Sequence, residues 1–238
     1  MEDKIQQFKQ LVNKCDNIVF FGGAGVSTES GILDFRSKDG LYNQQYKYPP
    51  ETILSHTFFM NKTEEFFKFY KLKMNSLKYQ PNITHIKLSE LEARGKLKAI
   101  ITQNIDGLHQ KAGSKVVYEL HGSVLRNYCM NCHKFYDAEY VFNSNGIPRC
   151  SCGGIIKPDV VLYEEGLDEE TIENSTDAIQ KADLLIVAGT SLTVQPASGL
   201  INFFRGRNLV LINRDSTPYD NKANLVINDS LGKVFSNL

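Results

Sequence analysis

The sequence predicts an α/β protein, with a parallel-sheet domain that carries a small inserted module. Short apolar runs alternate with helical stretches along most of the chain, which is typical of a mostly parallel sheet covered on both faces. The interval 123–157 breaks that alternation and holds four of the five cysteines. We therefore expect a Rossmann-like domain made of residues 1–122 and 158–238, with a helical insertion near 41–80, and a module made of residues 123–157.

The spacing of apolar residues predicts each element. Ile5, Phe8, Leu11 and Val12 recur at helical spacing, so residues 3–15 are expected to form an amphipathic helix. Short apolar runs predict buried strands at Asn17–Phe21, Leu97–Thr102, Val116–Leu120, Val160–Tyr163, Asp183–Ala188 and Asn208–Asn213. Longer stretches predict helices at Thr57–Lys73, Asn82–Arg94, 168–181 and 196–204. Residues 41–50, rich in tyrosine and proline, are expected to form a loop.

Composition and charge argue against several classes of protein. The 27 Lys and Arg residues balance the 27 Asp and Glu residues, and no basic stripe stands out, so nucleic acid is not an expected partner. The first residues lack the apolar core of a signal peptide, and no segment approaches the roughly 20 apolar residues that a membrane span needs. We expect a soluble cytoplasmic protein without a membrane partner. A monomer is our working expectation, although the sequence does not fix the oligomeric state.

A glycine-rich stretch, FFGGAGVSTESGILDFRS at residues 20–37, follows the first expected strand. Glycines at Gly22, Gly23 and Gly25 suit a phosphate cradle, because the backbone can approach an anion closely there. The dinucleotide fingerprint is incomplete, since Thr28 stands where its third glycine belongs and no ribose-binding acid follows a second strand. A tight turn between strand and helix would explain the glycines equally well.

The end of the same stretch favours ligand binding over a simple turn. Asp34, Phe35 and Arg36 are too polar for a core and too compact for an ordinary surface loop. Phe35 could cover a flat ring, and Arg36 could meet a phosphate or a carboxylate.

A second polar cluster, TQNIDGLH at residues 102–109, directly follows an expected strand. Ligands of open parallel sheets bind outside the carboxyl ends of the strands, so Thr102, Gln103, Asn104 and Asp106 should face the same crevice as the glycine loop. Amide side chains suit ribose hydroxyls and carboxamides, because they both donate and accept. A helix cap would explain one of these residues but not all four. His121 follows a third strand, where it could act as a general base.

The cysteines are paired as Cys129-x-x-Cys132 and Cys150-x-Cys152, which indicates a tetrahedral zinc site. Four thiolates leave no open coordination position, so the zinc should be structural. His133 would be a substitute ligand if one member of the second, tighter pair could not reach. Cys15 lies in the first expected helix and should simply be buried.

Taken together, the motifs resemble those of the sirtuins, a family of NAD-dependent protein lysine deacylases. The shared pieces occur in the family's order: GAGVSTESGILDFRS, TQNIDGLH, the pair His121-Gly122, the four-cysteine ribbon and GTSLTVQPAS at 189–198. The resemblance covers roughly residues 4–235 and is closest in kind to bacterial members. It implies that NAD and an acyl-lysine protein or peptide meet in the cleft between a Rossmann-like domain and a zinc module.

The resemblance also implies roles for individual residues. Catalysis would fall to His121 as general base, together with Asn104. The substrate peptide would pair as an added strand with Val160, Val161, Leu162 and Tyr163. The residues that would contact NAD are Gly23, Ala24, Gly25, Thr28, Asp34, Phe35, Arg36, Gln103, Asn104, Ile105, Asp106, His121, Gly189, Thr190, Ser191, Asn213 and Arg214.

The implied reaction transfers the acyl group of a modified lysine to ADP-ribose, releasing nicotinamide and 2′-O-acyl-ADP-ribose. Two alternatives use the same NAD site, namely a protein ADP-ribosyltransferase and a catalytically silent NAD-sensing module that binds peptides. An ordinary NAD dehydrogenase would need the missing ribose-binding acid and would have no use for the zinc ribbon.

Two departures from the family pattern concern the choice of acyl group. Tyr163 and Glu164 stand where the family has phenylalanine and glycine, and a Glu164 side chain could narrow or charge the mouth of the acyl tunnel. Tyr70 and Lys73 have the spacing of a Tyr-Arg pair in sirtuins that remove succinyl or malonyl groups. Lysine is not equivalent to arginine at a bidentate carboxylate site, so we expect a deacetylase first, with longer apolar acyl groups as further substrates.

Overall fold

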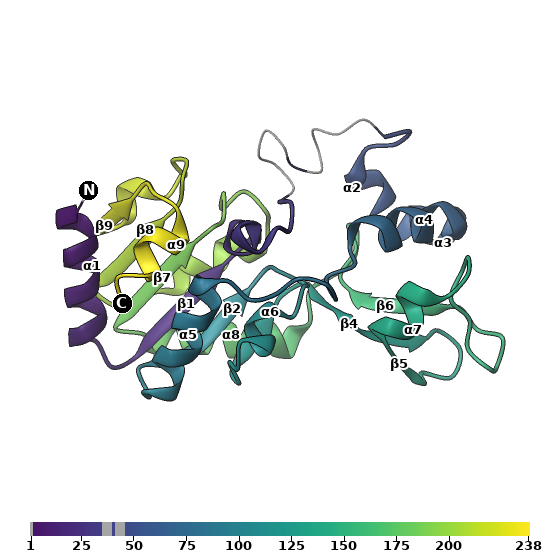
Figure 1. The fold of residues 1–238 in the computed structure, drawn as a ribbon, viewed down its shortest axis with the longest axis horizontal. Coiled ribbons are helices and arrows are strands. Elements are labelled where there is room, and N and C mark those ends of the chain that lie inside the picture. Colours follow the sequence, from purple (N-terminus) through teal and green to yellow (C-terminus); the bar gives the residue numbers. More distant parts are fainter. Residues whose placement is uncertain (1, 35–39, 41–45) are drawn as a thin grey trace.

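The structure, a computed structural model, describes residues 2–34, 40 and 46–238 of the chain. Two bodies lie end to end along its long axis, a larger one that contains both termini and a smaller one (Figure 1). No helix in the described ranges is long and apolar enough to cross a membrane. Phe35 and Arg36, to which the sequence assigns cofactor contacts, lie outside the described residues.

The larger body is built on a six-stranded sheet in the order β3-β2-β1-β7-β8-β9, and every pair in it is parallel. This confirms the Rossmann-like parallel sheet that the sequence predicts. The chain leaves β1 toward β2 on one side and later returns to β7 on the other, so the strand order reverses between β1 and β7. A ligand crevice is expected at that reversal. The strands are β1 Ile18–Gly22, β2 Leu97–Thr102, β3 Val117–Glu119, β7 Leu184–Ala188, β8 Asn208–Ile212 and β9 Leu225–Ile227.

Alternate side chains of β1 belong to two different cores, which is why its sequence is apolar throughout. Phe20 packs in the core that α1, α5 and α9 cover, whereas Val19 and Phe21 pack in the core that α8 and η4 cover. These helices are α1 Glu2–Lys14, α5 Ile83–Ala93, α9 Leu231–Phe235, α8 Glu169–Lys181 and the 3-10 helix η4 Ala197–Phe203. Short helical turns occur at η1 Ala24–Val26, η2 Thr28–Ser30, α6 Leu108–Lys111 and η5 Asp220–Lys222.

The smaller body joins a three-stranded antiparallel sheet, in the order β5-β4-β6, to a group of helices. Side chains of α4 such as Phe66 and Phe67 share one core with Val124 of β4 and Ile156 of β6. Residues near 50–74 therefore pack with the cysteine ribbon, and the expected boundary at 158 falls inside β6. The elements are α2 Pro50–Ile53, α3 His56–Asn61, α4 Thr63–Lys73, β4 Gly122–Cys129, β5 Phe135–Asp137, α7 Ala138–Asn143 and β6 Ile156–Val160.

Several element predictions differ from the structure, and β4, β5 and α7 of the smaller body were not predicted. A strand at Val160–Tyr163 is wrong, because β6 ends at Val160 and pairs with β4 of the smaller sheet. A single helix at Thr57–Lys73 is also wrong, since α3 and α4 are separated at Lys62, whose φ of −136° lies outside the helical region. The edge strand β9 was not expected, because three residues give too short a pattern to recognise.

Two histidines are buried together where α5 and α6 meet, and His109 contacts Phe20 of the inner strand β1. The ring centroids of His85 and His109 are 4.7 Å apart, and both side chains are almost fully buried. Among the described residues, His85 Nε2 and both ring nitrogens of His109 have no hydrogen-bond partner. Burial lowers the pKa of His85 to about 4. Burial, together with the neighbouring His85, lowers the pKa of His109 well below its ordinary value.

This pair makes the fold sensitive to acid. The folded pKa values lie below the value of about 6.5 for an unfolded histidine, so the unfolded chain binds more protons as the pH falls below that value. We expect the free energy of unfolding to fall from pH 6.5 toward pH 4, with up to about 1.4 kcal/mol per pH unit from each histidine. In urea unfolding measurements, the free energy of unfolding of a His109→Leu variant should depend less steeply on pH than that of wild type. Substitution of the exposed His133 by Gln should leave this pH dependence unchanged. Parallel curves for wild type and His109→Leu would contradict this account.

Candidate active site

A cavity of about 860 Å³ opens at the carboxyl ends of β1, β2, β7 and β8 and extends to the smaller body. Its volume is in the range of pockets that hold a cofactor or a drug-sized ligand. Of the residues to which the resemblance assigns contacts with NAD or the substrate, all those that the structure describes except Gly23 line this cavity. Gly22 and Thr102, which the sequence also places at the crevice, are not part of its lining. The structure thus brings together segments far apart in the sequence at the expected end of the sheet.

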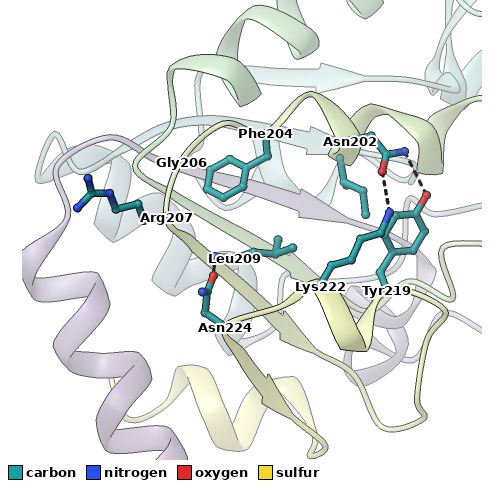
Figure 2. A pocket seen from close by; sticks show the side chains of 9 residues that line it. Asn202, Phe204, Gly206, Arg207, Leu209, Tyr219, Lys222 and Asn224 are labelled. Carbon is teal, nitrogen blue, oxygen red and sulfur yellow. Dashed lines mark hydrogen bonds between the residues drawn. The ribbon is translucent and has the colours of Figure 1, made fainter.

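A second hollow, of about 430 Å³, lies beside the amino end of β8 and contains none of the predicted site residues (Figure 2). Three of its polar side chains already bond to one another. Lys222 Nζ donates to Asn202 Oδ1 at 3.2 Å, and Asn202 Nδ2 donates to the Tyr219 hydroxyl at 3.3 Å. We therefore place the candidate active site in the larger cavity.

The glycines after β1 allow this loop to pack directly on the loop after β7. Gly25 N donates to Gly189 O at 2.8 Å, and Gly23 N donates to Ala188 O at 3.3 Å. A Cβ at Gly25 would lie 2.8 Å from Gly189 Cα, and a Cβ at Gly189, whose φ is +60°, would lie 2.5 Å from Val26 N. Neither position has room for a side chain. The glycines are thus required by contact between two backbones, which a simple tight turn does not explain.

The loop after β2 is held from both sides by hydrogen bonds to these two loops. Gln103 N donates to Gly22 O at 2.9 Å, and Gln103 Nε2 donates to Thr190 Oγ1 at 3.1 Å. Asn104 Nδ2 donates to Ser27 Oγ at 3.1 Å. The polar residues of TQNIDGLH are consequently fixed before any ligand arrives.

Asp106 forms the centre of a small buried network. Its Oδ2 accepts from the Ser27 hydroxyl at 2.7 Å and its Oδ1 accepts from Leu108 N at 2.9 Å. Burial raises the pKa of Asp106, and the bonds from Ser27 and Leu108 oppose that rise by stabilising the carboxylate. Both oxygens still have lone pairs to accept a further N–H from a ligand.

Ser27 is a site residue that the sequence analysis missed. It is buried, it bonds to Asp106 and Asn104, and it lines the cavity. Its signal was the run of small hydroxyl residues after the glycines, which on their own also suit a turn.

The hydrogen bond of His121 determines which of its nitrogens is basic. Its Nδ1 lies 2.9 Å from Gln103 O, and a carbonyl can only accept, so Nδ1 carries the proton. The lone pair of the neutral ring is then on Nε2. Burial lowers the pKa of His121, against a smaller opposing effect of the Gln103 bond, so the ring is neutral at pH 7. A neutral, oriented imidazole on the cavity wall is suited to take up a proton.

The cavity wall near β8 carries an unpaired buried donor. Asn213 Oδ1 accepts from Thr190 N at 2.9 Å, while Asn213 Nδ2 is buried without a hydrogen-bond partner among the described residues. An unpaired buried donor that lines a cavity calls for an acceptor, which a ribose hydroxyl would supply. Arg214 follows it on the same wall.

The segment after β6 forms the cavity wall toward the smaller body, but several of its backbone N–H groups already donate hydrogen bonds within the protein. The N–H groups of Val161, Leu162 and Tyr163 donate to His121 O, Glu165 Oε2 and Leu54 O respectively. An added substrate strand cannot receive hydrogen bonds from these three groups. The strand pairing that we expect from the sequence would have to use other backbone groups of the wall.

The side chain of Glu164 bonds to the amino end of α3. Its Oε2 accepts from Thr57 N at 2.9 Å in the first turn of α3. Hydrogen bonding from Thr57, first from its side chain and then from its backbone N–H, lowers the pKa of Glu164. Its φ of +77° is a value that favours glycine, the residue of the family pattern. The carboxylate therefore helps to hold the cleft wall on α3, and Glu164 still borders the cavity.

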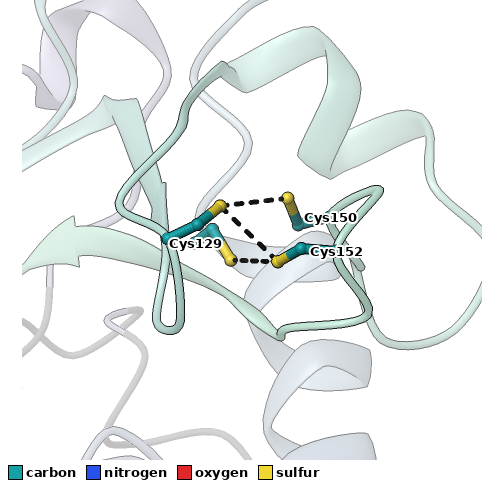
Figure 3. A group of neighbouring side chains, drawn as sticks. Cys129, Cys150 and Cys152 are labelled. Carbon is teal, nitrogen blue, oxygen red and sulfur yellow. Dashed lines mark hydrogen bonds between the residues drawn. The ribbon is translucent and has the colours of Figure 1, made fainter.

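The four cysteines of the ribbon converge on one point (Figure 3). Their sulfur atoms all lie within 4.8 Å of one another, with separations of 3.4 Å for Cys129–Cys152 and 3.6 Å for Cys132–Cys150. Disulfide sulfurs would be about 2.05 Å apart, whereas thiolates around one zinc are about 3.8 Å apart. The donor set fits a structural zinc, and His133 is not part of the group.

The ribbon's glycines make this convergence possible. Gly153 has a φ of +86°, and a Cβ at Gly154 would lie 2.6 Å from Cys129 Sγ. The tight Cys150-x-Cys152 pair thus reaches the cluster because glycines follow it.

Comparison with known proteins identifies the family. A model of the Sir2 family matches residues 23–196. A protein of Clostridium perfringens (strain 13 / Type A), named NAD-dependent protein deacetylase, is 62% identical over 238 residues that cover 98% of each chain. One of the same name from Cutibacterium acnes (strain DSM 16379 / KPA171202) is 52% identical over 233 residues, covering 97% of this chain and 96% of its own.

Solved structures that resemble this chain are Sir2 proteins as well. The structure "Sir2-p53 peptide-NAD+" matches with a TM-score of 0.87 and 38% identity, over 98% of this chain and 96% of that one. The structure "Sir2 bound to acetylated peptide" matches with a TM-score of 0.87 and 36% identity over the same shares. The resemblance seen in the motifs is thereby confirmed, and the chain belongs to the Sir2 family.

Proposed function

We propose that this protein is an NAD-dependent protein lysine deacetylase. The reaction converts an acyl-lysine side chain, NAD and water into free lysine, nicotinamide and 2′-O-acyl-ADP-ribose. The observation that carries the proposal is the neutral His121, whose free Nε2 shares one cavity with the Asp106 network and the glycine loop. The names of close relatives and the ligands of matching Sir2 structures support the same reaction.

Different residues would bind the two ends of NAD. NAD supplies an electrophilic ribose carbon when nicotinamide leaves. Asp106, held by Ser27 and Leu108, would accept a hydrogen bond from the nicotinamide carboxamide. Asn213 Nδ2 would donate to a hydroxyl at the adenine end. Both ends of the cofactor would therefore bind to side chains that hydrogen bonds already hold in place.

His121 would remove one proton. Its Nε2 takes that proton from a ribose hydroxyl, and the bond from Nδ1 to Gln103 O stabilises the cationic ring that results. Val160 and Leu162, which are buried, supply apolar surface where the acyl-lysine enters and help to exclude water.

The proposal is tested by incubating the protein with NAD and a panel of acetyl-, succinyl- and long-acyl-lysine peptides. Nicotinamide release and peptide mass should change together, fastest with the acetyl peptide. His121→Ala should reduce kcat/KM by about 10²- to 10⁴-fold, because general base catalysis is lost.

Other outcomes identify the alternatives. Nicotinamide release with ADP-ribose attached to protein, and no peptide deacylated, would favour a transferase. NAD binding without any turnover would favour a silent sensor. Faster turnover of the succinyl peptide would contradict our expectation about the acyl group.

A second prediction concerns the Asp106 network. Asp106→Asn replaces an acceptor-only group by an amide whose N–H₂ cannot accept from the carboxamide, so the KM for NAD should rise about tenfold or more. The KM for the acetyl peptide should change much less. Steady-state kinetics with each substrate varied in turn measure both values, and equal increases in the two would count against a specific role at the cofactor.

A third prediction concerns the cysteine cluster. We expect one zinc per chain by elemental analysis, with Cys150→Ser losing the metal and lowering the midpoint of thermal unfolding, because metal binding contributes folding free energy. Cys15→Ala is the matched control, since Cys15 is buried in the larger body away from the cluster. Full activity and unchanged stability after zinc removal would contradict a structural role.

A further inference from the structure

The junction between the two bodies contains an irregular segment of β4. Ser123 is paired with Asp159 of β6, and the next paired residue, Asn127, faces Pro158. Val124, Leu125 and Arg126 therefore have no partner of their own on β6. Such bulges bend a strand and redirect its side chains, and they are common beside active sites.

Two residues of this bulge contact the loop that contains Asp106. Val124 N donates to Ile105 O at 3.0 Å. Leu125 covers Gly107, where a Cβ would lie 2.5 Å from Leu125 Cδ1. The bulge is thus packed directly against the wall assigned to nicotinamide.

The third residue, Arg126, links the two sheets. Its Nη1 donates to Glu119 Oε2 at 2.6 Å, and its Nε donates to Asp159 Oδ2 at 2.7 Å. Glu119 ends β3 of the larger sheet, two residues before His121. Asp159 belongs to β6 of the smaller sheet, immediately before Val160 on the acyl-lysine wall. One guanidinium therefore joins the strand that leads to the base to the strand that leads to the substrate.

Burial makes this link strong at one end. The Glu119 side chain is only 7% exposed, while those of Arg126 and Asp159 are 39% and 42% exposed. A buried carboxylate needs a cation or several donors, so Glu119 depends on Arg126. Without Arg126, the carboxylates of Glu119 and Asp159 would repel each other across the junction.

We propose that Arg126 is a positioning residue of the reaction, which sets the distance between His121 and the acyl-lysine wall by bonding Glu119 and Asp159 together. A planar guanidinium bonds to both carboxylates at once in fixed directions, which a lysine ammonium does not reproduce. The inference rests on the proposed function, because it assigns the wall beside Val160 to the acyl-lysine.

The test measures binding and turnover separately in an Arg126→Met variant, which keeps the apolar part of the side chain and removes the charge. We expect the Kd of an acetyl-lysine peptide, measured by calorimetry, and its kcat/KM to worsen about tenfold or more, because small displacements of reacting groups cost large factors in rate. The Kd of NAD without peptide should stay within about twofold. Lys181→Met is the matched control, since it removes an exposed cation paired with Asp177 on α8 and should change neither value.

Two further variants separate positioning from general destabilisation. Adding Asp159→Asn to Arg126→Met should recover part of the lost peptide affinity, because it removes one of the two repelling charges. Arg126→Lys should fall between wild type and Arg126→Met. The inference is overturned if Arg126→Met binds and turns over the peptide like wild type. Equal weakening of NAD and peptide, or a further loss on adding Asp159→Asn, would also overturn it.

Measurements on the wild-type protein distinguish failure of the inference about Arg126 from failure of the proposed function. A wild-type protein that binds no acyl-lysine peptide refutes both. A wild-type protein that binds and deacylates the peptide, beside an Arg126→Met variant that behaves identically, refutes the role of Arg126 alone.

Discussion

The structure of the site depends on one contact, the packing of the loop after β1 on the loop after β7. Gly25 N donates to Gly189 O, and the glycines leave no room for side chains between the two backbones. This contact lies where the strand order of the sheet reverses, at the point where parallel α/β sheets bind ligands. The loop after β2 is then fixed on top of it through Gln103, which bonds to Gly22 O and to Thr190.

His121, the proposed base, and the proposed substrate wall are placed by the same arrangement. Gln103 presents its carbonyl to His121 Nδ1, so the loop that is held by the glycine contact also selects the tautomer of the base. The chain then enters β4, whose neighbour β6 leads to Val160. Consecutive backbone contacts therefore link the proposed cofactor wall, His121 and the proposed acyl-lysine wall. The cysteine ribbon lies at the far end of the same small sheet.

The sequence predicted the larger sheet well because its strands are buried on both faces. The strand Leu97–Thr102 has the bounds that the sequence predicts, and most of its residues are buried. The motifs at Asp106, His121 and Gly189 follow strand ends, as expected. The extent of the smaller body could not be read in the same way. Its core joins Phe66 and Phe67 to strands some 60 to 90 residues further on, and no local pattern records such a contact.

Individual roles were harder to predict where a residue has two plausible uses. Ser27 could have been a turn residue, and only its bonds to Asp106 and Asn104 assign it to the site. The sequence places Glu164 at the mouth of the acyl tunnel but does not show that its carboxylate accepts from the first turn of α3. In both cases the sequence specifies the polar group, and the partner is set by tertiary packing.

The most direct measurement of the central claim is a crystal structure of the protein with NAD and an acetyl-lysine peptide bound together. The account predicts the nicotinamide ribose within hydrogen-bond distance of His121 Nε2, the carboxamide on Asp106 and the acetyl-lysine beside Val160. Nicotinamide bound away from Asp106, or an acetyl-lysine that does not reach the ribose beside His121, would contradict it.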